Sequence, residues 1–143
     1  MSSTRTLVEN DLAAPVVSLF PSPSFECFEQ VPLARKRIDL VFVQRRKPLT
    51  ISVELKIENW RKALWQATVN FQVSQESYIA LWHRYIHRAE KQMDVLRAYG
   101  VGLIVVEYDI ARIVLPSTEP VRRIPARRKE AWYRSLLSNN SEV

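Results

Sequence analysis

Residues 49–57, LTISVELKI, alternate strictly between apolar and polar side chains. This period of two predicts a β-strand that buries one face and keeps the other polar. Glu54 and Lys56 fall on the same polar face, about 7 Å apart along the strand. If that face only meets solvent, the two residues form an ordinary polar rim. The neighbouring strand decides whether they do more.

The segment before this strand supplies a second carboxylate. Residues 37–43, RIDLVFV, are mostly apolar with Asp39 inside the run, and the short stretch QRRKP predicts an antiparallel hairpin. A buried carboxylate has to be paired or bind a metal. If the numbers of opposed residues add to an odd value, Asp39 faces Glu54 and Leu40 faces Val53. An even sum would put the aspartate in the apolar layer, so the pattern predicts the odd register.

Two carboxylates with a lysine beside them suit a hard cation. Oxygen ligands favour Mg²⁺ (or Mn²⁺), and Mg²⁺ keeps several waters for a phosphate-bearing substrate. Such an ion polarises a phosphoryl oxygen and lowers the pKa of a bound water. A lysine orients that water or neutralises charge in the transition state. We therefore expect phosphodiester hydrolysis, with Asp39 and Glu54 holding the metal and Lys56 positioning the attacking water.

Helices and further strands flank this hairpin. Periodicity and breaker residues predict helices at 6–20, 60–71, 84–99 and 126–137, and further strands at 25–33, 78–82, 101–108 and 111–115. Thr6 and Glu9 have the spacing of a capping box, and Pro15 is expected to kink or split the first helix. Asn59 is a candidate N-cap and Gly100 a helix stop. The order α-β-β-β-α-β-α-β-β-α indicates a mixed sheet with helices packed on it.

Composition indicates one globular domain. The chain has 143 residues with 47% hydrophobic content, and we expect a single domain over residues 1–137 with a frayed tail at 138–143. Its one cysteine, Cys27, excludes an internal disulfide and suits a reducing compartment. No apolar run has the length of a transmembrane helix, and the N-terminus lacks the apolar segment of a secretory signal. We expect a cytoplasmic protein with no membrane partner.

The charge balance points to an acidic partner. The formal net charge is +6, and nucleic acid is the commonest partner of such an excess. The basic residues occur in short runs, whose expected role is to contact phosphates. The candidates are Arg45, Arg46, Lys47, Arg61, Arg127, Arg128 and Lys129. A solvated basic helix without such a role is the alternative for the C-terminal run.

At Asp39 and at the acid-x-lysine of residues 54–56, the sequence resembles the PD-(D/E)XK nuclease superfamily. The hallmark of that superfamily is an acid on one strand followed by acid-x-lysine on the next. The pieces VENDLAAPV, RIDLVFV, VELKIENWRKALWQA and SYIALW look like small members of it, over roughly residues 6–115. Ile38 stands where the family's name has proline. The resemblance implies the restriction-endonuclease-like fold, an α/β mixed sheet with an α-β-β-β-α-β core.

The resemblance also implies supporting residues and a substrate. Some members carry a glutamine on the helix after the acid-x-lysine, which matches Gln66, and a first-helix glutamate at the metal site, which matches Glu9. The alternative for Gln66 is the polar flank of an amphipathic helix, and a capping role explains Glu9 equally well. We expect a metal-dependent nuclease, an endonuclease or an exonuclease, that acts on nucleic acid, with DNA favoured over RNA. Its selectivity would come from loops, the C-terminal helix, a homodimer or a partner. A catalytically silent nucleic-acid-binding or scaffolding module, and a domain that binds an acidic protein, are the alternatives.

Overall fold

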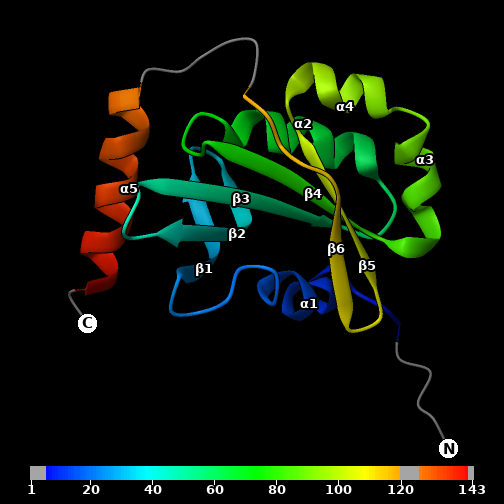
Figure 1. Cartoon of the computed structure of the whole chain (residues 1–143), viewed down its shortest axis with the longest axis horizontal. Helices are drawn as coiled ribbons and strands as arrows, with labels where there is room; N and C mark the ends of the chain where they lie inside the picture. The colour runs from blue at the N-terminus through cyan, green and yellow to red at the C-terminus, as the bar shows by residue number, and fades with distance from the viewer. Residues whose placement is uncertain (1–5, 120–125, 142–143) are drawn as a thin grey trace, which may run out of the picture.

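One six-stranded sheet forms the centre of the part of the chain that the structure describes (Figure 1). The structure is a computed structural model that describes residues 6–119 and 126–141, without the side chains of 126–128, 130 and 139–141. The strands are β1 (Phe25–Leu33), β2 (Lys36–Gln44), β3 (Leu49–Lys56), β4 (Glu76–Trp82), β5 (Gly102–Glu107) and β6 (Ile110–Leu115). They lie in the order β1-β2-β3-β4-β5-β6. The predicted mixed α/β architecture is confirmed.

The pairing of the strands follows the hydrophobic pattern. β1, β2 and β3 form an antiparallel meander, β3, β4 and β5 are parallel, and β6 returns antiparallel to β5. Leu40 lies opposite Val53, and Phe42 lies opposite Ile51, so the residue numbers of each opposed pair on β2 and β3 add to an odd value. The predicted register and the predicted parallel pairing after the central helix are both confirmed.

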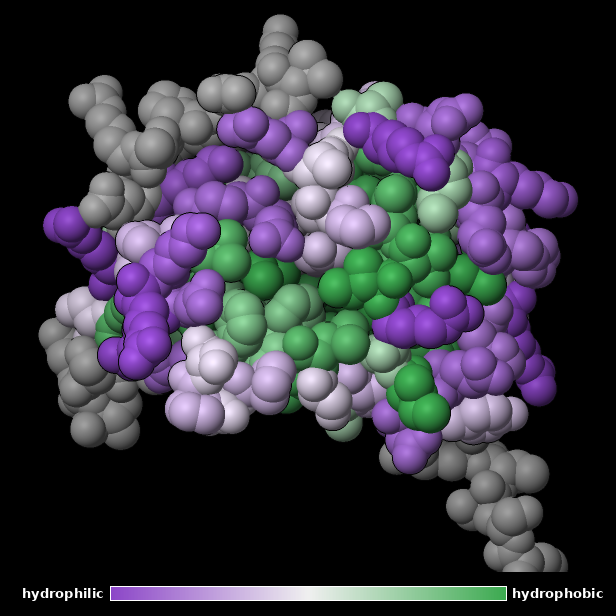
Figure 2. All heavy atoms as spheres, viewed as in Figure 1, coloured by the Kyte–Doolittle hydropathy of each residue, from purple (hydrophilic) through white to green (hydrophobic). Residues whose placement is uncertain are grey.

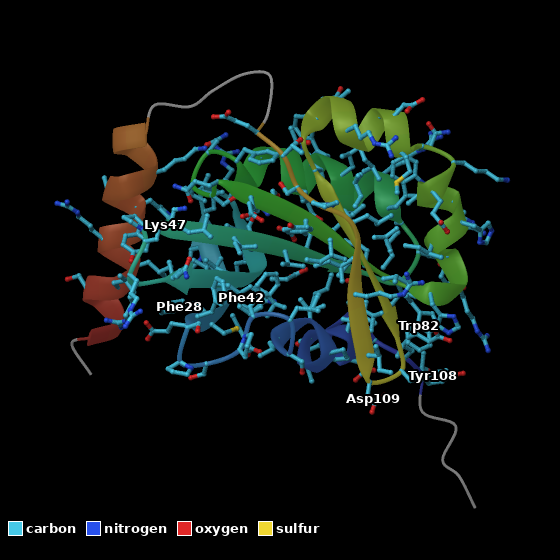
Figure 3. All side chains as sticks on the ribbon, in the orientation of Figure 1. Phe28, Phe42, Lys47, Trp82, Tyr108 and Asp109 are labelled. Carbon is cyan, nitrogen blue, oxygen red and sulfur yellow. The ribbon has the colours of Figure 1, made fainter. Side chains whose placement is uncertain are left out.

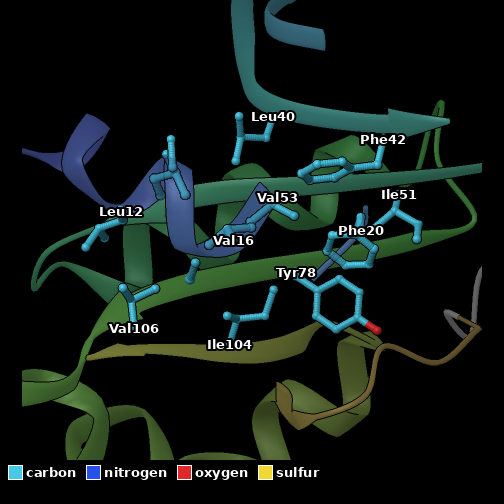
Figure 4. Packing of buried hydrophobic residues seen from close by; sticks show 13 residues of the cluster. Leu12, Val16, Phe20, Leu40, Phe42, Ile51, Val53, Tyr78, Ile104 and Val106 are labelled. Atoms are coloured by element: carbon cyan, nitrogen blue, oxygen red, sulfur yellow. The ribbon is translucent and has the colours of Figure 1, made fainter. Parts of the chain in front are cut away.

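The first face of the sheet is covered by the N-terminal helices, a 3-10 turn η1 (Glu9–Leu12) and α1 (Ala13–Val17). Figure 4 shows their apolar side chains on those of β2, β3 and β4. Leu12 and Val16 are fully buried there, and Phe20 stacks on Phe42 with ring centroids 4.5 Å apart. Full burial of each aliphatic side chain stabilises the fold by about 1.5–3 kcal/mol.

The second face is covered by α2 (Trp60–Asn70), α3 (Ile86–Glu90) and α4 (Met93–Tyr99), with a short 3-10 turn η2 (His83–Tyr85) before α3. Asn59 caps α2 by accepting a hydrogen bond from the Lys62 N–H at 3.3 Å, as predicted. Because α2 connects the parallel strands β3 and β4, it runs antiparallel to both. This direction decides which of its side chains reach which part of β3.

The C-terminal helix α5 (Ala126–Ser141) lies beside β1 and β2 at one side of the molecule (Figure 1). Trp132 and Leu136 pack against the apolar residues of that hairpin, and the Tyr133 hydroxyl donates to the Gln44 carbonyl at 3.1 Å. The helix continues to Ser141, so the tail expected from residue 138 is helical over 138–141. Figure 2 shows apolar surface near the middle of the visible face, surrounded by hydrophilic residues.

Two helix predictions were wrong in detail. The first helix, expected over 6–20, is the separate pair η1 and α1, with Pro15 in the first turn of α1, where its missing N–H has no helical partner to lose. The Thr6 capping box is absent from η1, because the Val8 N–H binds the Asp11 carboxylate at 2.8 Å. The helix expected over 84–99 is divided into η2, α3 and α4.

At two positions the local structure requires a glycine. Gly100 ends α4 with φ 75°, in the left-handed region that glycine adopts without strain. Gly102 begins β5 so close to the Tyr78 ring that a Cβ atom would clash with it. The predicted helix stop at Gly100 is confirmed.

Candidate functional site

The β2–β3 ladder ends beside the two candidate carboxylates. Its last pair is Leu40 with Val53, and the next pair in the same register is Asp39 with Glu54. The Leu55 N–H donates to Asp39 Oδ2 at 2.8 Å. A side chain therefore takes over from the backbone ladder at this point, and the two carboxylates come from neighbouring strands on one face of the sheet.

On its other side, Asp39 meets an irregular part of β1. Gln30 has φ 51°, in the left-handed region that costs a non-glycine residue about 1–2 kcal/mol. Its Nε2 donates to Asp39 Oδ1 at 3.2 Å, and the pairing of β1 with β2 is interrupted there. Figure 4 shows that β2 turns sharply close to Leu40. Asp39 thus lies at a bend, held from both neighbouring strands.

The polar face of β3 is covered by protein and is not a solvent rim. Glu54 is 1% exposed and Ser52 is fully buried. The Ser52 hydroxyl lies 2.9 Å from that of Ser74 and donates to that of Ser77 at 3.1 Å, and Ser77 in turn donates to the Ala67 carbonyl of α2. Such a buried polar layer is stable only because its members are hydrogen-bonded to one another. The interpretation of this face as an ordinary polar rim is wrong.

Lys36, at the start of β2, contacts Glu54 directly. Its Nζ lies 2.7 Å from Glu54 Oε2 and 2.6 Å from Asn70 Oδ1. The Asn70 Nδ2 donates to the same Glu54 oxygen at 2.6 Å, which closes a triangle of three side chains. Neither Lys36 nor Asn70 was identified from the sequence. The one signal for Asn70 was its position a helical turn after Gln66.

The environment of Glu54 opposes its negative charge. Burial raises the pKa of the Glu54 carboxyl above its usual range, and the charge of Asp39 raises it further. The hydrogen bonds from Lys36 and Asn70, together with the positive charge of Lys36, act in the opposite direction and lower this pKa. Lys36 is therefore the cation that stabilises the ionised form of Glu54.

Lys56 pairs with Glu9 at the end of β3. Its Nζ lies 3.4 Å from the Glu9 carboxylate; the lysine side chain is 14% exposed and that of the glutamate 46%. The structure thus brings Asp39 and Glu54 together, and it joins Lys56 to Glu9. The contact between Glu9 and β3 crosses from η1 to the polar strand face, although its capping role is absent.

Gln66 lies on the same side of α2 as Asn70. Because α2 runs antiparallel to β3, a step of one turn back along the helix has the same direction as a step of two residues forward along the strand. Each step covers about 6–7 Å. Because Asn70 contacts Glu54, Gln66 is level with Lys56. Its Oε1 is buried and has no hydrogen-bond partner in the ranges that the structure describes. Such an acceptor costs about 1–3 kcal/mol unless a donor or a cation reaches it.

The atoms of this site that could bind a metal ion are oxygen atoms. Asp39 and Glu54 supply carboxylates, and the side-chain amides of Gln66 and Asn70 lie on the helix above. Among the described residues, no group of three or more histidine, cysteine, aspartate or glutamate side chains is placed to hold a metal. Two carboxylates supplemented by water are nevertheless a common way for proteins to bind Mg²⁺.

The basic residues predicted to bind nucleic acid are spread around the molecule. Arg46 and Lys47 are exposed in the β2–β3 turn, and Figure 3 shows Lys47 at the end of the sheet near α5, far from Trp82 and Tyr108. Arg45 is paired with Glu26 at 2.6 Å and is therefore partly neutralised. The other candidates lie on α2 and α5.

Arg61 is exposed at the start of α2, and its guanidinium lies 5.6 Å from the centre of the Trp60 ring. Burial lowers the pKa of Lys129, although the charge of Glu119 opposes this effect. Arg127 and Arg128 belong to α5, but their side chains lie outside the described residues. The candidates thus come from three separate parts of the chain: the β2–β3 turn, α2 and α5.

Comparisons with known proteins show a likeness of fold. No protein-family model matches the sequence, and no curated protein matches it. A solved structure of a protein of unknown function from Silicibacter pomeroyi is similar, with a TM-score of 0.67 and 17% sequence identity. The match covers 94% of this chain and 86% of that chain. At this identity the likeness concerns the fold alone. In the described ranges, no helix is long and apolar enough to cross a membrane.

Proposed function

We propose that the chain is a metal-dependent nuclease on a restriction-endonuclease-like fold, acting on phosphodiester bonds of DNA. The observation that carries this proposal is the placement of Asp39 and Glu54 on one face of neighbouring strands, where their ladder ends. Glu54 is buried and Asp39 is half-buried. A buried carboxylate is expensive unless it is paired or bound to a metal, and a second carboxylate beside it increases the cost. The lysine, glutamine and asparagine around them are the groups that metal-assisted hydrolysis uses.

The donors fit Mg²⁺ or Mn²⁺. Asp39 and Glu54 would hold the ion, with the Gln66 amide oxygen and waters as further oxygen ligands or hydrogen-bond partners. When bound, such an ion polarises a phosphoryl oxygen and lowers the pKa of a coordinated water. The buried Gln66 oxygen, which has no hydrogen-bond partner among the described residues, could accept a hydrogen bond from a water bound at this site.

The chain's own residues orient the reacting groups. The Leu55 N–H and Gln30 fix the two oxygens of Asp39, and Asn70 fixes Glu54. A lysine ammonium near these carboxylates would hydrogen-bond to the attacking water or to a phosphate oxygen, and both Lys36 and Lys56 are candidates. Exposed basic residues such as Arg46 and Lys47 would hold the phosphate backbone on either side.

Cleavage assays with and without Mg²⁺ or Mn²⁺ test this proposal. Single-stranded, duplex and branched DNA and RNA would be incubated with wild type, Asp39→Asn and Glu54→Gln. We expect metal-dependent cleavage that each substitution reduces at least a hundredfold. Asp94→Asn is the matched control, because this carboxylate is fully exposed on α4 and should not matter. Full activity of both site variants would refute the proposed mechanism.

A catalytically silent nucleic-acid-binding module is the second candidate. It is favoured by one observation, that Asp39 and Glu54 already have hydrogen-bonding partners within the protein. Such a module would bind DNA with an affinity that falls as salt rises, and it would cleave no substrate with either metal. The same set of substrates therefore separates the two candidates.

A further inference from the structure

Two lysines compete for the role of the site's ammonium group, and they belong to different strands. Lys36 comes from β2 and contacts Glu54 at 2.7 Å. Lys56 comes from β3, two residues after Glu54, and contacts Glu9 at 3.4 Å. We propose that Lys36, rather than Lys56, is the lysine that acts with Glu54 on the substrate. This inference rests on the proposed nuclease function and specifies which residue supplies the positive charge.

The bend in β2 is what makes this contact. Lys36 precedes Asp39 by three residues. If β2 were straight, the segment from Lys36 to Asp39 would continue to pair with β3. The ladder instead ends at Leu40, where β2 turns sharply (Figure 4). The turned segment places the Lys36 ammonium between Glu54 of β3 and Asn70 of α2. The irregular backbone of Gln30 is part of the same bend.

The hydrogen-bond capacity of Lys36 leaves room for a substrate contact. An ammonium group has three N–H donors. Glu54 and Asn70 account for two of them among the described residues. The side chain is 20% exposed, so the ammonium group is not sealed from solvent. The third donor can therefore reach a water or a phosphate oxygen beside the carboxylates.

Asn70 is a positioning residue for this pair. Its amide oxygen accepts from Lys36, and its amide nitrogen donates to Glu54, so one rigid side chain fixes both. Lys56 has a different partner: its charge is offset by a glutamate that is 46% exposed. The Lys56 side chain itself is only 14% exposed, but water reaches its glutamate partner far more easily than it reaches Glu54, which is 1% exposed. The preorganised lysine is the one on β2.

In the reaction, the Lys36 ammonium group donates a hydrogen bond. The water oxygen forms a bond to phosphorus while the bond from phosphorus to the leaving oxygen breaks. The water's proton passes to solvent, and the leaving oxygen takes a proton from solvent. The positive charge of Lys36 stabilises the negative charge that the phosphoryl oxygens gain in the transition state.

Single-turnover cleavage compares the two lysines. Lys36→Met, Lys36→Arg and Lys56→Met would be measured with Mg²⁺ and Mn²⁺ on the DNA that wild type cleaves best, with Lys91→Met as an exposed control. We expect Lys36→Met to slow the reaction by about 10²–10³-fold and to leave DNA affinity within about threefold. Lys36→Arg should recover part of the rate, because it keeps the charge but changes its geometry. Lys56→Met should be at least tenfold faster than Lys36→Met.

A second measurement does not depend on activity. In the metal-free protein, the ¹⁵Nζ–H signal of Lys36 should be protected from exchange with solvent by its two hydrogen bonds, and Asn70→Ala should remove this protection. Protection of Lys56 in place of Lys36, or a Lys36→Met variant that cleaves at the wild-type rate, would overturn the inference and leave the nuclease proposal standing. A wild-type protein that cleaves no substrate would overturn both.

Discussion

Replacing Lys36 with methionine should make the fold's stability depend strongly on pH. Methionine keeps most of the apolar stem of the lysine but removes the charge beside Glu54. The glutamate is 1% exposed, so water cannot compensate for the lost partner. The carboxyl must then either remain charged and unpaired or take up a proton. The cheaper of these two outcomes sets the loss of unfolding free energy.

The free-energy cost differs between an unpaired Glu54 charge and a protonated Glu54. Breaking a buried ion pair by removing one partner costs about 3–5 kcal/mol. Protonating a glutamate with an ordinary pKa of about 4.3 costs about 4 kcal/mol at pH 7 and about 1 kcal/mol at pH 5. We therefore expect Lys36→Met to lose about 3–4 kcal/mol at pH 7 and about 1 kcal/mol at pH 5.

The direction of this pH effect follows from proton binding. Burial already raises the pKa of Glu54 in the wild type, and Lys36 opposes that rise. In the variant the pKa rises further, so the folded protein holds a proton that the unfolded chain releases above about pH 4.3. Stability then falls as pH rises from that value to the pKa of the folded state.

Denaturant unfolding of the metal-free protein at pH 5 and pH 7 measures the effect. Lys56→Met is the matched control, because its partner Glu9 is 46% exposed and water can replace the lysine there. No charge is left buried in this variant, so we expect its loss of stability to be the same at pH 5 and pH 7. The double variant Lys36→Met/Glu54→Gln should lose most of the difference between the two pH values. An equal loss for Lys36→Met at pH 5 and pH 7 would show that Glu54 is not the group responsible.

Substitutions at three other positions test the fold and the nucleic-acid surface. Gly102→Ala puts a methyl group against the Tyr78 ring, and thermal unfolding should show a loss of about 1–3 kcal/mol. Asn59→Ala removes the cap of α2 and should cost about 1 kcal/mol in the same assay, whereas Asn59→Asp should retain most of it. Lys47→Ala should lower the log–log salt slope of DNA binding by about 0.9, and an unchanged slope would exclude a phosphate contact there.

The strands were predictable because their information is local. Strict alternation in β3 and the apolar run in β2 locate both strands, and matching their apolar faces selects the register that places Asp39 beside Glu54. A one-residue slip would have buried the aspartate among apolar side chains, so only one register fits. The parallel pairing of β4 with β3 follows from the helix between them.

The contact of Lys36 with Glu54 was not predictable in the same way. It depends on a bend in β2, on an irregular conformation at Gln30 and on Asn70 from the next helix. None of these leaves a periodic signal in the sequence. Alternation alone placed Lys56 with Glu54, and it could not show that Glu9 draws the lysine to the strand's end.

Helix boundaries were less predictable than strands because capping groups compete. Two carboxylates lie near the start of η1, and the Asp11 side chain, not that of Glu9, reaches back to the preceding backbone. The apolar stripe expected over 84–99 is present, with Ala89 and Leu96 buried, yet the helix is divided between them. The apolar stripe can be buried without one continuous helix, because each short helix needs only to turn its own apolar side chains toward the sheet.

The identity of strand order and chain order has a consequence for synthesis on the ribosome. Each strand, as it emerges, finds its sheet neighbour already made, and only the α2 and α3–α4 connections separate strands by more than a turn. Short connections between paired strands keep the contact order low, which favours rapid folding. The residues around Glu54 lie between positions 30 and 70, so they emerge before β5 and β6 are translated. The last strand, β6, remains at the edge of the sheet, where pairing with another newly made chain is the expected error.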